Sequence, residues 1–258
     1  MRLNPGDHVC ALYQEDAELA AIVGDFLADG LRCGERCWYL PAAAEAAIVR
    51  DALALEQFNV ESLIDRGALA ILSSDAAYAM RGAFDPEETM HAFSTAIEQA
   101  LADGYSGFRA AANMSWALDR EDSAELLIAY EALLRSLFES ARATGLCLYD
   151  RRRMPMAVIA GAVSTHPLIR LDDGFGVNEF YDPRVRALRD ARPETAVAAL
   201  ARLDGRSPES RAARGRPVVK YEVPERYRSG RNGGASKASC RVTGTGVRIP
   251  PSPPFLTT

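Results

Sequence analysis

Seven polar or aromatic residues end, or directly follow, the apolar runs that the sequence predicts to be buried strands. In an open α/β sheet, ligands bind in the crevice outside the carboxyl ends of the strands. A small-molecule site needs apolar and aromatic walls with a few polar groups. We therefore expect any ligand pocket to be lined by Tyr13, Ser73, Asn113, Trp116, Tyr149, Asp150 and Arg151. The alternative interpretation is that Trp116 and Tyr149 complete the core and that Arg151 lies in a solvated loop.

The segment Tyr13–Glu18, between the first predicted strand and the first predicted helix, has the wrong chemistry for a phosphate-binding loop. Such a loop needs glycines, whose backbone N–H groups surround the phosphates, and a lysine. This segment contains neither, and it carries three acids, Glu15, Asp16 and Glu18. Acids suit the positive end of a helix dipole but repel phosphate. We predict helix capping here, with binding of a cation or an amine as the alternative.

The three histidines and five cysteines form no familiar catalytic or metal-binding pattern. The sequence contains neither a GxSxG nor an HExxH motif, and no two cysteine pairs have the spacing of a zinc site. We expect His8 to form a structural hydrogen bond with Asp7, His91 to lie solvated on a helix, and His166 to lie in a loop. We therefore predict no catalytic residues, no metal site and no cofactor.

The elements that must position these residues alternate along the chain. Runs typical of buried strands are 8–13, 36–40, 68–72, 108–114 and 146–149, with a final edge strand at 168–171. Helical spacing marks 18–31, 42–55, 85–103, 123–144 and 157–163. Strands separated by single helices imply right-handed crossovers and a mostly parallel sheet. The pattern predicts an α/β fold of three layers, with a mostly parallel sheet flanked by helices.

The composition changes near Asp204. Eleven basic and three acidic residues follow Asp204, so the part that ends there carries 19 basic and 32 acidic residues. We predict an α/β domain over residues 1–204 and a disordered basic tail over 205–258, because the tail is rich in Gly, Ser, Pro and Arg. Val247–Pro250 matches what a common tRNA sequence encodes, so one hypothesis is that the coding frame runs into a tRNA gene. The alternative is a genuine flexible tail.

Five segments, in order and with similar spacing, resemble the MEDS domain, a methanogen/methylotroph sensory domain named after a dichloromethane-responsive regulator. They are PGDHVCALYQ, GLRCGERCWYL, GAFDPEETM, GYSGFRAAANMSWAL and the pair YEALL…LCLYD, within residues 4–180. The resemblance implies a derivative of the RecA/KaiC ATPase fold and a role in sensing small molecules, such as hydrocarbon-like compounds, and signalling to transcription. The chain departs from the family pattern at Asn113, where an acidic residue is common.

The function that we expect is non-catalytic regulation in bacterial signal transduction or transcription control. The chain would bind a small organic ligand or a signalling protein, such as a kinase, a sigma-factor regulator or a transcription factor. A domain that signals by contact should expose an apolar patch. The alternative is an unrecognised enzyme that uses Asp7 with His8, or Asp150 with Arg151. A homo-oligomer is compatible with either function.

The sequence also predicts the subcellular location of the protein and excludes two classes of partner. Its first residues have no signal-peptide pattern, and no apolar run is long enough to span a membrane. An acidic body is a poor surface for nucleic acid, because binding to phosphates needs clustered Lys and Arg. We therefore expect a cytoplasmic protein without a membrane or nucleic-acid partner.

Overall fold

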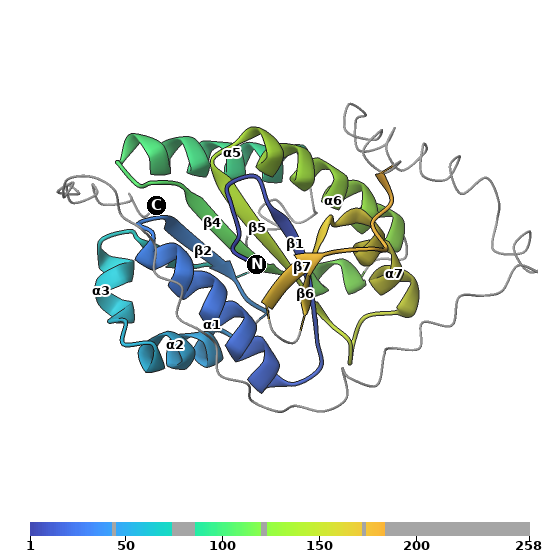
Figure 1. Cartoon of the computed structure of the whole chain (residues 1–258), viewed down its shortest axis with the longest axis horizontal. Coiled ribbons are helices and arrows are strands. Elements are labelled where there is room, and N and C mark those ends of the chain that lie inside the picture. The colour runs from blue at the N-terminus through green and yellow to red at the C-terminus, as the bar shows by residue number, and fades with distance from the viewer. Residues whose placement is uncertain (43–44, 74–85, 120–122, 172–173, 184–258) are drawn as a thin grey trace, which may run out of the picture.

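The computed structural model describes residues 1–42, 45–73, 86–119, 123–171 and 174–183 (Figure 1). The strands are β1 (His8–Tyr13), β2 (Arg36–Leu40), β3 (Leu69–Ile71), β4 (Phe108–Asn113), β5 (Ala143–Asp150), β6 (Leu168–Leu171) and β7 (Gly174–Val177). The α-helices are α1 (Asp16–Arg32), α2 (Ala46–Leu55), α3 (Val60–Asp65), α5 (Pro86–Ala102), α6 (Ser123–Ser140) and α7 (Met156–Thr165). A short 3-10 helix spans Ser115–Asp119. The predicted boundary at residue 204 and the tail 205–258 lie outside the described residues.

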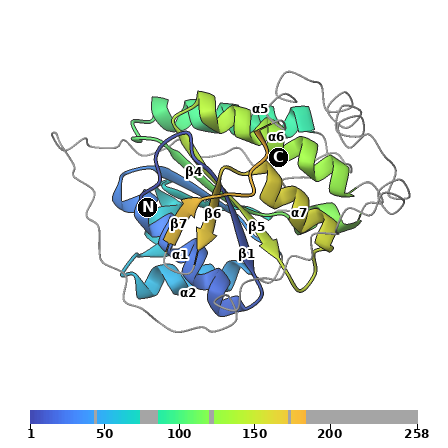
Figure 2. The same ribbon diagram turned by 45° about the vertical axis from the view of Figure 1, so that its right-hand side comes forward.

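The strands form one seven-stranded sheet in the order β3-β2-β4-β5-β1-β6-β7. Every neighbouring pair is parallel except β6 and β7, which pair antiparallel. Helices α1 and α2 cover one face of the sheet, and α5, α6 and α7 cover the other (Figure 1, Figure 2). The predicted three-layer α/β fold with a mostly parallel sheet is therefore confirmed. None of the described helices is long and apolar enough to cross a membrane.

The central strands β1, β4 and β5 are buried almost throughout. Because helices cover both faces, these strands are near-continuous apolar runs rather than alternating ones. A polar side chain on such a strand must find its hydrogen-bond partners inside the protein. The polar side chains of β1, β4 and β5 therefore mark the places where the structure has built a specific site.

Acidic residues cap the N-terminus of α1, as the sequence predicts for this connection. The Glu18 carboxylate accepts hydrogen bonds from the backbone N–H groups of Gln14 and Glu15, over 2.8 and 3.3 Å. The second of these bonds is part of a capping box. Asp16 and Glu18 both lie in the first turn, where the helix dipole favours negative charge. Gly34 follows the helix with a φ of 76°, a left-handed conformation that glycine adopts without strain.

Three elements differ from the sequence prediction. Helix α3 was not predicted. Strand β5 begins at Ala143, whereas the sequence predicts a helix up to residue 144. The small residues at the start of β5 are buried in the sheet, as are all the others of this strand. Strand β6 is not the edge of the sheet, since β7 pairs beyond it. The glycine-rich sequence of β7 has low intrinsic strand propensity, so pairing rather than propensity makes it a strand.

Candidate functional site

The first candidate site lies at the carboxyl ends of β1, β2 and β4, and we call it the strand-end cluster: Tyr13, Tyr39, Glu45 and Asn113. All four side chains are buried. The Tyr13 hydroxyl donates to Glu45 Oε1 over 2.7 Å, and Asn113 Nδ2 lies 2.8 and 3.0 Å from the two carboxylate oxygens. Asn113 Nδ2 also lies 2.8 Å from the Tyr13 hydroxyl oxygen. The Tyr39 hydroxyl and the Ala42 N–H both donate to Glu45 Oε2, over 3.4 and 3.0 Å.

Neutral hydrogen-bond donors hold the buried Glu45 carboxylate. Within the described part of the chain, Glu45 forms no ion pair. Burial, followed by the bonded Glu45 carboxylate, raises the pKa of Tyr13 far above its usual value. Burial and Glu45 also raise the pKa of Tyr39, so both hydroxyls keep their protons and remain donors. The cluster is therefore a polar network that joins three strand ends, and Glu45 at its centre was absent from the predicted site because it lies beyond β2, next to α2.

Arg152 lies on the solvent side of the strand-end cluster. Its guanidinium is above the Tyr13 ring, 5.8 Å from the ring centre, and its side chain is 45% exposed whereas Tyr13 is fully buried. Two of its nitrogens donate to the two Asp150 oxygens over 2.9 and 3.0 Å, and a third donates to Asp16 over 3.0 Å. Arg152 thus joins the end of β5 to the start of α1. The sequence pointed to Arg151 instead, whose side chain forms no ion pair among the described residues.

The structure brings together only some of the seven predicted site residues. Tyr13 and Asn113 are in direct contact, and Asp150 joins them through Arg152. Tyr149 lies on the opposite face of the sheet, fully buried against α6. Trp116 packs its ring edge-on against Tyr130 of α6, with the ring centres 5.6 Å apart. Ser73 is exposed beyond β3, the edge strand. That these residues bind a ligand stays a prediction.

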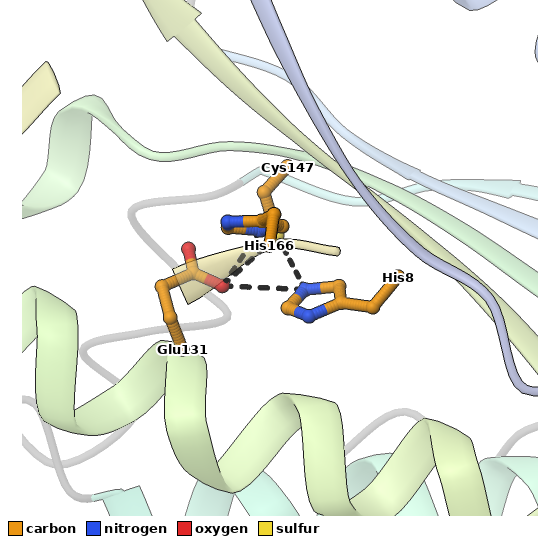
Figure 3. A group of neighbouring side chains, drawn as sticks. All are labelled: His8, Glu131, Cys147 and His166. Atoms are coloured by element: carbon orange, nitrogen blue, oxygen red, sulfur yellow. Dashed lines mark hydrogen bonds and ion pairs between the residues drawn. The ribbon is translucent and has the colours of Figure 1, made fainter. Parts of the chain in front are cut away.

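A second group of polar side chains lies on the other face of the sheet, between β1, β5, α6 and α7 (Figure 3). We call His8, Glu131, Cys147 and His166 the histidine cluster; all four are buried. Three atoms converge on Glu131 Oε2: His8 Nε2 at 3.2 Å, His166 Nε2 at 3.2 Å and Cys147 Sγ at 3.3 Å. His8 Nε2 also lies 3.2 Å from Cys147 Sγ. The Tyr149 hydroxyl donates to the other oxygen of Glu131.

The histidine cluster holds a buried negative charge. Burial alone would raise the pKa of Glu131, but its interactions with His166 and His8 lower it well below its usual range. Burial, reinforced by His166, lowers the pKa of His8 to about 4, so His8 is neutral at neutral pH. Burial and the neighbouring Glu131 raise the pKa values of the Cys147 thiol and the Tyr149 hydroxyl. Glu131 is therefore an ionised acceptor among groups that keep their protons.

One of the three histidine predictions was wrong. His8 does not bond Asp7, whose carboxylate instead accepts the backbone N–H of Asn4 over 2.7 Å. The His8 side chain points into the layer between the sheet and α6. His166 lies in the connection between α7 and β6, as predicted, but it is fully buried there, at the C-terminal cap of α7. His91 is exposed on α5, as predicted. The Asp7–His8 pair considered for an enzyme therefore does not form.

Glu131 is the signal that could have revealed the histidine cluster. It lies at a core position of α6, four residues after the buried Leu127 and seven before the buried Phe138. A carboxylate on the apolar side of a helix requires buried donors. β1 and β5 pair in parallel with His8 opposite Gly145, which places His8 and Cys147 on neighbouring strands. Those donors could not be identified without knowing this strand order.

The histidine cluster also has the composition of a metal site. Its four potential ligand atoms all lie within 4.8 Å of one another, and it is the only such group found among the described residues. Imidazole nitrogen, thiolate sulfur and carboxylate oxygen are all ligands of zinc. The expectation of no metal site rested on local motifs, whereas these residues come from four separate elements.

Comparison with known proteins gives a family match and two solved structures of low similarity. A family model described as MEDS, the methanogen/methylotroph, DcmR sensory domain, matches residues 7–167, more than half of the chain. A KaiC-like protein from the hyperthermophilic archaeon Pyrococcus horikoshii is 14% identical, with a TM-score of 0.45, over 64% of this chain and 70% of that one. An uncharacterised protein from Pyrococcus horikoshii, in complex with an unknown peptide, is 13% identical, with a TM-score of 0.45, over 71% and 87%. No curated protein matches the chain.

Proposed function

This chain belongs to the MEDS family of sensory domains, and from that premise we propose that it is a non-catalytic regulatory module in bacterial signalling. The observation that carries this proposal is the chemistry of the connection from β1 to α1. Its acids already cap α1 and pair with Arg152, and no glycine or lysine is present to bind phosphate. A nucleotide would therefore meet negative charge at the place where a phosphate-binding loop supplies N–H donors.

We place the response to a small organic ligand at the strand-end cluster. The cluster offers a tyrosine hydroxyl, an amide and a carboxylate within one hydrogen-bonded group, which can recognise a ligand with both donor and acceptor atoms. Access requires Arg152 to move away from Tyr13. Because Arg152 is 45% exposed, its ion pairs contribute little stability, typically about 0–1 kcal/mol each. Displacing Arg152 would also break its bonds to Asp150 of β5 and Asp16 of α1. Ligand binding would thereby free α1 to move relative to the sheet.

We propose that a signalling protein binds this domain near β7. This strand pairs with β6 on one side only and is the last strand of the sheet in the described part of the chain. Two large apolar side chains lie exposed there, Val177 at 72% and Phe180 at 61%. An exposed sheet edge beside exposed apolar side chains is a recognised mode of protein docking. This supports a protein partner as the receiver of the signal.

A thermal-shift screen of the full chain with small organic metabolites tests the ligand proposal. A compound at about 100 times its Kd adds about 2.7 kcal/mol, which raises the Tm of a domain of this size by about 5–10 °C. We expect the shift to fall in Tyr13→Phe, which loses the hydroxyl bonded to Glu45, and to persist in Tyr105→Phe. The control loses a hydroxyl that donates to the Arg66 carbonyl over 3.1 Å, away from the cluster. The proposal would be contradicted if no compound raises the Tm, or if a compound raises the Tm of both variants equally.

A further inference from the structure

The ring of His166 is oriented so that its Nε2 points into the histidine cluster. Its Nδ1 lies 2.7 Å from the Ala162 carbonyl oxygen, which can only accept a hydrogen bond, so Nδ1 carries the proton. In the neutral ring, Nε2 is then a lone-pair acceptor. This Nε2 is buried without a hydrogen-bond partner, although it lies 3.2 Å from Glu131 Oε2. Two acceptors that face each other at this distance need a cation between them.

The spacing of the four groups fits a metal ion as that cation. Zinc binds nitrogen and oxygen at about 2.0–2.2 Å and sulfur at about 2.3 Å, so the edges of its ligand tetrahedron are about 3.3–3.8 Å long. The contacts of Glu131 Oε2 with His8, His166 and Cys147 measure 3.2, 3.2 and 3.3 Å. Cys147 Sγ and His8 Nε2 are 3.2 Å apart, so all four contacts lie at or slightly below the lower end of this range. All four atoms fall within 4.8 Å of one another, so a bound ion would draw the more distant atoms together by at most about 1.5 Å.

Neighbouring groups hold the four residues in place by hydrogen bonds and packing, as is usual for metal ligands. A metal-bound histidine usually donates its other ring N–H to a carbonyl or carboxylate, as His166 does to Ala162. The Tyr149 hydroxyl bonds the Glu131 oxygen that faces away from the other three groups. Gly161 lets α7 approach α6, because a Cβ at residue 161 would lie 2.5 Å from Ile128 Cδ1. The positions of His166 and Glu131 are therefore fixed by packing as well as by bonding.

We propose that His8, Glu131, Cys147 and His166 bind one zinc ion in a closed, structural site. Two neutral imidazoles, the Cys147 thiolate and the Glu131 carboxylate together carry two negative charges, which balance the charge of a divalent zinc ion. The four ligands come from β1, α6, β5 and the C-terminal cap of α7, so the ion ties both helices to the centre of the sheet. With four protein ligands and no exposed side chain, the site has no open position for a substrate. It is independent of the ligand response assigned to the strand-end cluster.

Metal analysis of the full chain, purified without a histidine tag, tests this proposal. We expect about one zinc per chain in the wild type, and at least about tenfold less in Cys147→Ala and His166→Ala. Cys37→Ala is the matched control and should retain the zinc. Its thiol is equally buried, but it lies near the carbonyl oxygens of Leu27 and Glu35 instead of the histidine cluster. Circular dichroism establishes that each variant is folded.

Refolding in the presence of Co²⁺ keeps the proposal testable if the ligand variants do not fold. The wild type and Cys37→Ala should both show the charge-transfer band of a cobalt–thiolate bond and the visible bands of tetrahedral cobalt. A folded wild type that carries no zinc and shows no cobalt–thiolate band would overturn the proposal, and a proton shared by His166 and Glu131 would then be the cation. Equal zinc in the wild type and both ligand variants would also overturn it, because the metal would be bound elsewhere.

Discussion

Replacing Glu131 by alanine should lower the free energy of unfolding by about 3–5 kcal/mol, because it removes the acceptor of a fully buried polar network. The Tyr149 hydroxyl and the Cys147 thiol both donate to this carboxylate, and His8 Nε2 lies 3.2 Å from it. Each buried donor left without a partner costs about 1–3 kcal/mol. The cavity left by the shortened side chain adds to the loss.

Urea denaturation in a buffer that contains a chelator measures this effect independently of bound metal. Glu98→Ala is the matched control, since it makes the same change at an exposed residue of α5. The Glu98 carboxylate accepts an exposed hydrogen bond from the Ser94 hydroxyl over 3.5 Å, so its loss should change the free energy of unfolding by at most about 0.5 kcal/mol. A Glu131→Ala variant as stable as Glu98→Ala would show that the network around Glu131 contributes nothing to the fold.

Replacing Arg109 by alanine should cost a similar amount, about 3–5 kcal/mol, on the other face of the sheet. Arg109 on β4 is 2% exposed, and its Nε donates to Glu35 over 2.5 Å. Its Nη1 donates to the Phe26 carbonyl over 2.8 Å and to Asp29 over 3.2 Å. Without Arg109, the Glu35 carboxylate, 9% exposed, would remain buried beside an unpaired carbonyl.

A double variant separates the effect of the unpaired charge from that of the lost side chain. Arg109→Met with Glu35→Leu replaces the ion pair by apolar groups of similar size, a change that is often neutral or stabilising. We expect this double variant to be clearly more stable than Arg109→Ala in urea denaturation. If the double variant is instead the less stable of the two, the Arg109–Glu35 pair itself is the source of stability.

Hydrophobic periodicity predicted most of the fold. Apart from α3, the alternation of apolar runs and helical spacing predicted the order of the elements through α7, because central strands covered on both faces are apolar along their whole length. Gly30 shows where local signals misled. Glycine near the end of a helical pattern commonly marks the C-terminus of the helix, but α1 continues past Gly30 to Arg32. Gly30 instead makes room for Arg109, whose Cδ would lie 2.8 Å from a Cβ at residue 30. A glycine that is required for close packing between a helix and a strand cannot be recognised from the hydrophobic periodicity of the sequence.

The candidate sites were predicted less completely, because they depend on the order of the strands. Tyr13 and Asn113 could be placed together, because each ends a strand and the carboxyl ends of parallel strands lie at the same edge of the sheet. Glu45 could not, because it reaches the cluster from the connection between β2 and α2. The histidine cluster joins residues as distant in sequence as His8 and His166. Their convergence follows from β1 lying between β5 and β6 in the sheet, an order that no local pattern indicates.

Calorimetric titration of the full chain with magnesium–ATP tests most directly the central claim that this α/β domain is a sensory module without nucleotide chemistry. The account predicts no saturable binding up to about millimolar nucleotide, because Glu15, Asp16 and Glu18 repel phosphate at the N-terminus of α1. Saturable binding with a Kd below about 1 mM, accompanied by release of phosphate, would contradict it. That result would make the chain an ATPase with an unrecognised phosphate site.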